Sequence, residues 1–245
     1  MLYPHITKDE TNPNLIKVKN RLLSALPRDE FERLLPHMEV VHKSQGKIIY
    51  EPGATMDNLY FPNNGMISLL SMNEDGTTIE VAMVGNEGVV GLTYILQLKT
   101  TLYGAMIQLP SDLIKIKGEV AAAEFKRGGV FNSLLLRYTH LLLTQISQSV
   151  VCNRFHPIEK RLCRWLLTAS YGLKLNTLHL TQEIIGHMLG VPRTGVTMAA
   201  VSLQRAGLIR YSRGKIEFVN REAMEAASCE CHQIIKEELE RFLDI

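Results

Sequence analysis

A block of basic side chains in the second half of the chain could bind a polyanion. Residues 151–221 hold eleven Lys and Arg against three Asp and Glu, whereas the 245-residue chain has a net charge of only +2. Guanidinium and ammonium groups gathered in one segment are typical of a surface that neutralises phosphates. The alternative is an ordinary solvated basic surface. Which of the two applies depends on the element that carries these groups.

The stretch LTQEIIGHMLGVPRTGVTMAAVSLQRAGLI, residues 180–209, predicts two short helices joined at a glycine. Thr181 can cap the first helix, and Gly190 can adopt the left-handed conformation of a tight corner. Pro192 suits the first turn of the second helix. The second helix has one inward face of small or apolar residues: Val196, Ala199, Ala200 and Leu203. Small inward residues let two helices cross closely, so the pattern predicts a helix-turn-helix.

The outward face of the second helix would carry the side chains that read bases. The N-terminal residues of such a helix meet base edges in the major groove. After it, LIRYSRGKIEFV predicts two short strands around Arg213-Gly214, which would form a wing against phosphates. The residues predicted to bind DNA are Thr181, Gln182, Arg193, Thr194, Thr197, Met198, Arg205, Arg213 and Lys215.

Residues 129–151 predict a long helix with two apolar stripes. Leu136, Leu143 and Val150 form the second stripe, well over 100° from the first. A helix at the edge of a domain needs only one apolar face, so a second one predicts pairing with the same helix of another subunit. Burial within its own domain is the alternative. The residues predicted at the dimer interface are Phe131, Leu134, Leu135, Tyr138, Leu141, Leu142 and Ile146.

Apart from these segments, the sequence predicts an antiparallel β-roll with short helices before it and an acidic helix at the end of the chain. Short apolar runs over residues 40–117 alternate with Gly, Asn and Asp turns, a pattern typical of an antiparallel roll or barrel. Residues 14–26 and 27–38 predict short amphipathic helices before it. Residues 221–243 predict one long acidic amphipathic helix.

The segment Cys229-Glu-Cys231-His232 carries thiols and an imidazole, which are metal ligands. On one helix Cys231 would point about 200° away from Cys229, so one helix cannot present all three side chains to a tetrahedral ion. We therefore predict no metal site, with Cys231 in the core and its neighbours exposed; metal or thiol sensing is the alternative. His140 and His156 could ligate haem, but as single histidines they are predicted to be structural or solvated.

Taken together, the glycine-punctuated roll, the long helix and the C-terminal winged helix resemble the cyclic-AMP receptor protein/fumarate-nitrate reductase regulator (Crp/Fnr) family. Residues 180–209 are the most specific part, and EPGATMDNLYFPNNGMISLL and NEDGTTIEVAMVGNEGVVGL resemble the sensor domain of that family. The resemblance implies a homodimeric bacterial transcription regulator that binds a palindromic double-stranded DNA operator and contacts RNA polymerase. It also implies an α+β chain. Residues 1–128 would form a cyclic-nucleotide-binding-like β-roll sensor, 129–151 a dimerisation helix, and 152–245 a winged helix-turn-helix domain with an acidic helix.

The recognition helix departs from the usual pattern of the family. Arg193 stands where the family has its guanine-reading arginine, and Arg pairs best with guanine O6 and N7. The usual glutamate that follows is Thr194, and the usual second arginine is Met198. Threonine and methionine favour contact with a thymine methyl, so we expect a half-site that differs from the best-known one.

The effector site departs further. Val90 falls where nucleotide-binding members have a ribose-binding glutamate, and Leu102-Tyr103 fall near their phosphate-binding pair. A cyclic phosphate would lose its charge-assisted contact, so we predict a roll with an altered pocket. The candidate pocket residues are Gly85, Glu87, Val90, Lys99, Leu102 and Tyr103, of which Lys99 or Glu87 could substitute for the missing groups.

The effector and any cofactor stay unknown from the sequence. One alternative is a regulator that needs a cyclic nucleotide or another small effector in order to bind DNA. Another is a ligand-binding protein whose winged helix contacts proteins. No cysteine precedes Cys152, so the N-terminal iron–sulfur cluster of some relatives is not expected.

Several classes of protein are disfavoured. No apolar run is long enough for a membrane helix, which needs about 20 residues, and the N-terminus lacks the pattern of a secretory signal. The four cysteines show no disulfide framework, so a cytoplasmic protein is expected. There is no phosphate-binding glycine loop, zinc-ligand pair or nucleophile motif, so an enzyme is not expected.

Overall fold

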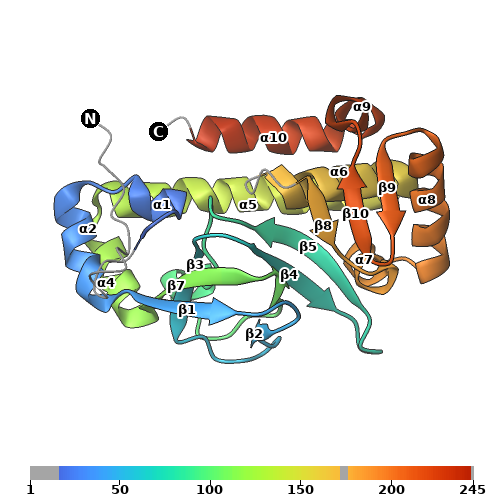
Figure 1. The fold of residues 1–245 in the computed structure, drawn as a ribbon. Helices are drawn as coiled ribbons and strands as arrows, with labels where there is room; N and C mark the ends of the chain where they lie inside the picture. The colour runs from blue at the N-terminus through green and yellow to red at the C-terminus, as the bar shows by residue number, and fades with distance from the viewer. Residues whose placement is uncertain (1–16, 172–175, 244–245) are drawn as a thin grey trace. The chain divides into compact units, whose positions relative to one another are not determined.

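The protein was analysed as a computed structural model that describes residues 17–171 and 176–243 (Figure 1). Its described part forms two compact units, one of residues 17–67 and 84–139 and the other of residues 68–83 and 140–243. The boundaries predicted at residues 128 and 151 divide the chain differently. The second of them falls within the long helix α5, Gly129–Phe155. The α+β class is confirmed.

The first unit is built on antiparallel strands. β7 lies between β1 and β3, and β2 pairs with β6. Its strands are β1 (Glu39–Lys43), β2 (Ile48–Tyr50), β3 (Asn58–Pro62), β6 (Gly104–Leu109) and β7 (Ser111–Lys117). Its helices are α1 (Arg21–Ser24), α2 (Arg28–Leu34), η1 (Leu35–His37), α3 (Leu92–Ile95) and α4 (Gly118–Arg127). The core between them is apolar, with Leu59, Phe61, Ile107 and Ile114 fully buried.

The helix predicted over residues 14–26 is wrong in its described part. Only Arg21–Ser24 is helical, and residues 14–16 lie outside the described residues. Asn20 is the reason, because its backbone N donates to Asn63 Oδ1 at 3.1 Å and its side chain donates to the carbonyls of Pro62 and Gly88. These bonds hold the chain extended where the apolar pattern would continue a helix.

The start of α5 is capped from another element. The carboxylate of Glu30, on α2, accepts from the backbone N of Val130 at 2.8 Å and of Phe131 at 2.7 Å. A buried carboxylate at a helix N-terminus satisfies orphan donors and opposes the positive end of the helix dipole. Gly129, with φ 79°, makes the turn into the helix.

The two stripes of α5 have opposite environments. Of the residues predicted at a dimer interface, Phe131, Leu134, Leu135, Tyr138 and Leu141 are buried within their own chain, and Leu142 and Ile146 are half-buried. By contrast, Leu136, Leu143 and Val150 are 54%, 58% and 66% exposed. The first stripe therefore packs mostly against its own chain, and the second stripe is an exposed apolar one.

The second unit contains a three-stranded sheet, five complete helices and the second half of α5 among its described residues. The sheet is antiparallel in the order β8-β10-β9, formed by β8 (Thr177–His179), β9 (Ile209–Ser212) and β10 (Lys215–Phe218). The helices are α6 (Ile158–Tyr171), α7 (Gln182–Leu189), α8 (Arg193–Arg205), α9 (Arg221–Ala227) and α10 (Glu230–Leu243), together with residues 140–155 of α5. The hairpin between β4 (Met66–Met72) and β5 (Thr78–Val84) also joins this unit through residues 68–83.

The single acidic helix predicted over residues 221–243 is two helices. α9 ends at Ala227, the backbone of Ser228 is extended, and α10 begins at Glu230. Cys229 therefore precedes a helix, which makes the angle expected between Cys229 and Cys231 on one helix inapplicable. In addition, Cys229 and His232 are 4% and 5% exposed, so the exposed neighbours predicted for Cys231 are in fact buried.

No helix in the described part of the chain is long and apolar enough to cross a bilayer.

Candidate nucleic-acid interface

The two helices α7 and α8 meet at a tight corner. The hydroxyl of Thr181 caps α7 by accepting from Ile184 N at 3.2 Å. Gly190 is left-handed, with φ 61°, and Val191 N donates to Gly186 O at 3.0 Å to close the turn. A Cβ on Gly186 would lie 2.9 Å from Val191 O, so only glycine permits this approach. The helix-turn-helix predicted here is confirmed.

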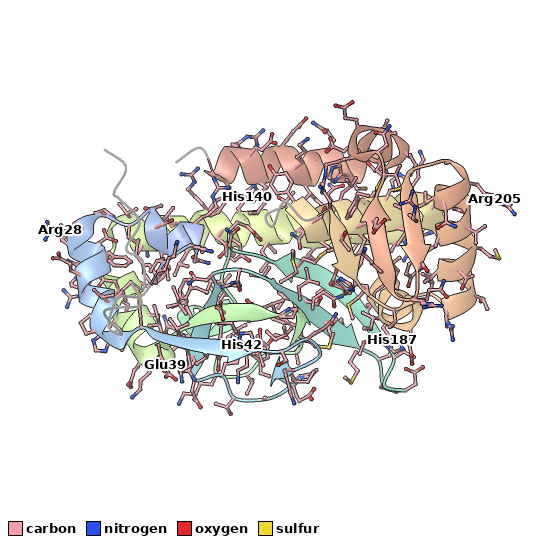
Figure 2. All side chains as sticks on the ribbon, viewed as in Figure 1. Arg28, Glu39, His42, His140, His187 and Arg205 are labelled. Carbon is pink, nitrogen blue, oxygen red and sulfur yellow. The ribbon has the colours of Figure 1, made fainter. Side chains whose placement is uncertain are left out.

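The inner and outer faces of α8 are cleanly separated. Val196, Ala199, Ala200 and Leu203 are buried, as the pattern predicts. On the outer face Met198 is 69% exposed and Val201 is 42% exposed. A shallow depression of about 350 Å³ along this face is lined by Thr197, Met198, Val201, Ser202 and Arg205. Figure 2 shows Arg205 on α8 pointing away from the protein.

Two of the predicted contact residues bind each other. The hydroxyl of Thr197 is 2.8 Å from Gln182 Oε1 and 3.0 Å from Arg193 O, and it can donate to one of them at a time. Gln182 is thereby fixed at the start of α7 beside the first turn of α8. A side-chain amide held in this way keeps its NH₂ group available as a donor.

The wing follows α8 as the sequence predicts. Arg213 and Gly214 have positive φ values of 48° and 77°, which are the conformations of a two-residue hairpin turn between β9 and β10. Tyr211 anchors the wing because its hydroxyl donates to Leu180 O at 2.9 Å. The third strand, β8, adds to β10 and was not predicted.

The wing and the two helices enclose a second depression of about 470 Å³. Four predicted residues come together there: Thr181, Gln182, Arg193 and Arg213. Glu183, Tyr211, Ser212 and Gly214 complete the lining and were not among the predicted contacts. The alternation of the strand Ile209–Ser212 could have indicated Ser212, which follows the anchored Tyr211 on the opposite face.

Lys215 is engaged within the wing. Its Nζ lies 2.5 Å from Glu217 Oε1, and Arg210 reaches the other oxygen of the same carboxylate at 3.3 Å. The hydrogen bond from Lys215 is the main reason that the pKa of Glu217 is lowered. Lys215 is therefore partly neutralised, whereas Arg193 and Arg213 have no ion pair among the described residues. These two arginines are the cationic groups that line the depression, and Glu183 is the carboxylate there.

The predicted effector residues do not converge in the same way. Val90 is buried and exchanges backbone hydrogen bonds with Tyr60, whereas Lys99 is exposed and Leu102 is 91% exposed. Glu87 turns back onto its own loop, where it accepts from Gly85 N at 2.7 Å, and burial raises the pKa of its carboxyl. Tyr103 lies with its ring 6.3 Å from that of Tyr50. These positions offer no cationic group that faces a common point.

Two family models match the chain. Residues 160–227 match a Crp-like helix-turn-helix domain, and residues 40–133 match a cyclic nucleotide-binding domain. The first match spans the helices and wing described above. The second spans most of the strands of the first unit together with the β4–β5 hairpin.

Known proteins with this organisation are similar over most of their length. The global nitrogen regulator of Synechocystis sp. is 24% identical over 212 residues, which cover 82% of this chain and 93% of the relative. A structure described as a transcriptional regulator of the Crp/Fnr family from Eubacterium rectale superposes with a TM-score of 0.67 at 19% identity, over 84% of this chain and 96% of that one. FixK2 from Bradyrhizobium japonicum superposes with a TM-score of 0.68 at 16% identity, over 78% and 98%. The structural likenesses establish a shared fold.

Proposed function

We propose that this chain, which belongs to the Crp/Fnr family of transcription regulators, is a homodimer that binds a palindromic DNA operator with one α8 helix in each half-site. The observation that carries the proposal is the depression where Arg193 and Arg213 meet Thr181 and Gln182. Its polar groups come from the N-terminus of α7, the N-terminus of α8 and the turn of the wing. This is the set of elements that contact bases and phosphates in helix-turn-helix proteins.

Within the half-site, Arg193 reads guanine. It lies exposed in the first turn of α8, the part of a recognition helix that reaches base edges. Thr194 and Met198, which are also exposed, favour thymine methyl groups, and Arg205 and the wing contact phosphates. Thr197 acts through Gln182, which it holds in place.

The dimer forms through the exposed stripe of α5. Leu136, Leu143 and Val150 are spaced seven residues apart, with Thr139 and the half-buried Ile146 between them. This is the a and d spacing of a two-stranded coiled coil. A two-fold axis along this seam would present two α8 helices to half-sites about 34 Å apart.

The first unit receives a signal other than cyclic AMP bound in the usual manner. Val90 is buried where a ribose-binding carboxylate would be needed, and Leu102 points to solvent where a phosphate-binding arginine would be needed. An effector would act by shifting the population of dimers whose α8 helices match the operator. We place this regulator in the cytoplasm as a protein without enzymatic activity, with RNA polymerase as a further partner.

Selection from random duplex DNA with no added effector tests the proposal. Enrichment of a two-fold symmetric motif, with binding that weakens steeply as salt rises, is the expected result. A protein without operator preference, both alone and with small effectors added, would contradict it. Binding to DNA with little salt dependence would also contradict it, because phosphate contacts release counterions.

A further inference from the structure

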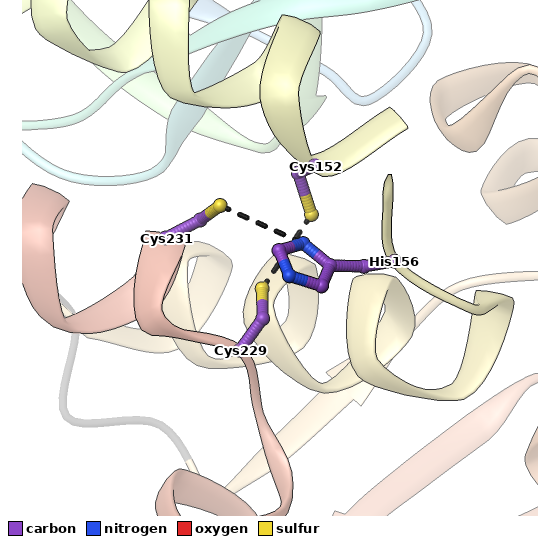
Figure 3. A group of neighbouring side chains, drawn as sticks. All are labelled: Cys152, His156, Cys229 and Cys231. Carbon is purple, nitrogen blue, oxygen red and sulfur yellow. Dashed lines mark hydrogen bonds between the residues drawn. The ribbon is translucent and has the colours of Figure 1, made fainter. Parts of the chain in front are cut away.

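Four side chains of types that can ligate a metal ion lie close together in the second unit (Figure 3). None of them lines the two depressions beside α8. Cys152 lies near the end of α5, and His156 follows that helix directly. Cys229 precedes α10, and Cys231 lies in its first turn. One ligand atom from each residue lies within 4.8 Å of all the others. We call Cys152, His156, Cys229 and Cys231 the Cys₃His cluster.

The distances within the cluster fit one tetrahedral ion. Cys152 Sγ and Cys229 Sγ are 3.6 Å apart, and Cys231 Sγ is 3.7 Å from His156 Nδ1. Around a tetrahedral zinc ion with Zn–S of about 2.3 Å and Zn–N of about 2.0 Å, neighbouring ligand atoms are separated by about 3.5–3.8 Å. Two of the separations thus match those around one ion, and every pair of ligand atoms lies within 4.8 Å.

The histidine is oriented as metal-bound histidines are. Its Nδ1 faces Cys231, while its Nε2 lies 3.2 Å from Glu230 Oε1. A carboxylate that accepts from the second ring nitrogen fixes the tautomer and leaves the first nitrogen unprotonated as a ligand. Glu230 is therefore a positioning residue for His156.

A buried guanidinium lies beside the cluster. The buried Arg164 donates from Nε to Cys152 Sγ at 3.2 Å. Three thiolates and a zinc ion carry one net negative charge, which this guanidinium offsets. Burial of all three cysteines excludes water, as in closed structural sites.

We propose that the Cys₃His cluster binds one zinc ion, which fastens the α9–α10 junction to the end of α5. Four protein ligands leave no open position, so the ion has a structural role rather than a catalytic one. The set of donors, three sulfurs and one nitrogen, is one that zinc prefers. A disulfide between Cys152 and Cys229 is the competing state, but it would use only two of the four convergent groups.

Metal analysis of the full-length protein, purified with a thiol reductant from medium supplied with zinc, tests this directly. We expect about one zinc ion per chain by native mass spectrometry and elemental analysis. Its removal by a chelator should lower the melting temperature, and added Zn²⁺ should restore it. Replacement by Co²⁺ should give the intense visible bands of tetrahedral coordination and a thiolate-to-metal charge-transfer band.

Variants assign the ligands. Cys152→Ser and Cys231→Ser should lose the ion, and Glu230→Gln should keep it with affinity reduced about 10–100-fold. Cys163→Ala is the matched control, because Cys163 is also fully buried but lies outside the cluster. It should bind zinc like the unaltered protein. If the serine variants fail to fold, the Co²⁺ spectrum of the unaltered protein decides on its own.

Three results would overturn the proposal. The reduced protein could fail to bind Zn²⁺, the ion found could be iron or copper rather than zinc, or the mass could show a Cys152–Cys229 disulfide as the resident state. None of these readouts involves DNA, so failure here is distinct from failure of the proposed regulator function.

Discussion

Trp165 Nε1 donates a 2.7 Å hydrogen bond to Glu80 Oε1, which joins α6 to the β4–β5 hairpin within the second unit. The other carboxylate oxygen accepts from Ser68 Oγ at 2.5 Å. Burial raises the pKa of Glu80 to about 7, although both hydrogen bonds and the charge of Arg164 lower it. A carboxyl that titrates near neutral pH thus lies at the contact between the hairpin and the core of this unit.

The first prediction is that Glu80 makes the protein less stable as pH rises through about 7. The folded carboxyl keeps its proton up to that pH, whereas the unfolded one loses it near 4.5. The stabilisation is therefore complete below pH 4.5 and is lost as pH rises toward and through 7. At about 1.4 kcal/mol per pKa unit, the loss is on the order of 3 kcal/mol.

Glu80→Gln should remove this pH dependence, because glutamine accepts from Trp165 and donates to Ser68 without a charge. The free energy of unfolding in urea, measured at about pH 5 and about pH 8, checks it. Glu74→Gln, on the exposed turn of the same hairpin, is the matched control and should behave like the unaltered protein. An identical pH slope in Glu80→Gln and the unaltered protein would show that Glu80 does not titrate as described.

The second prediction concerns Arg193. Arg193→Ala should reduce the preference for operator over random DNA by about 1–3 kcal/mol, because a bidentate contact to guanine is lost. Competition binding at fixed salt measures this preference. Arg28→Ala removes an exposed arginine in the first unit and should leave it unchanged. Undiminished discrimination by Arg193→Ala would refute its assigned role.

The parts of the nucleic-acid interface that could be predicted are those encoded by residues close together in the sequence. The α7–α8 corner follows from residues within one stretch, namely Thr181, Gly190 and the small residues facing inward, and its existence and exposed face agree with the structure. Local hydrogen bonds and positive φ at a glycine are encoded by neighbours in sequence. The wing turn at Arg213-Gly214 was found for the same reason.

Features that depend on distant residues were missed. The Cys₃His cluster joins Cys152 and His156 to Cys229 and Cys231 across more than 70 positions, and a helical wheel drawn through Cys229 could not show it. The end of α9 at Ser228, which leaves Cys229 outside both helices, has no glycine or proline to mark it.

The two stripes of α5 are a second such feature. Periodicity indicates both stripes but does not tell which of them is covered by the same chain. Burial decided that, and placed Leu135 inside and Leu136 outside.

The third prediction is that the exposed stripe of α5 holds the dimer together. Leu143→Glu should give monomers, because the dimer would bury the new carboxylate of one chain against the same carboxylate of the other chain. Light scattering measures the change, and loss of operator affinity should accompany it. Leu98→Glu is the matched control, since Leu98 is equally exposed, at 57% against 58%, but is not part of α5. A Leu143→Glu protein that remains dimeric would place the interface elsewhere.

The last prediction compares the stability of two alanine variants of the helix-turn-helix, at Gly186 and at Gly195. Gly186→Ala places a Cβ 2.9 Å from the carbonyl oxygen of Val191, whose backbone N also closes the turn. This neighbour is a backbone atom, which cannot move aside as the end of a flexible side chain can. The turn between α7 and α8 must therefore widen, which should lower the free energy of unfolding by about 1–3 kcal/mol. Gly195, by contrast, lies within α8 and a Cβ there meets nothing within 4 Å.

Gly195→Ala should therefore raise stability by up to about 1 kcal/mol, because alanine loses less conformational freedom in a helix than glycine. Thermal or urea unfolding of the two variants should thus move in opposite directions from the unaltered protein. Because α8 carries Arg193, Gly186→Ala should also weaken operator binding at temperatures where it is still folded. Equal stability of the two variants would mean that the corner relaxes freely, and that close approach at Gly186 does not fix the position of α8.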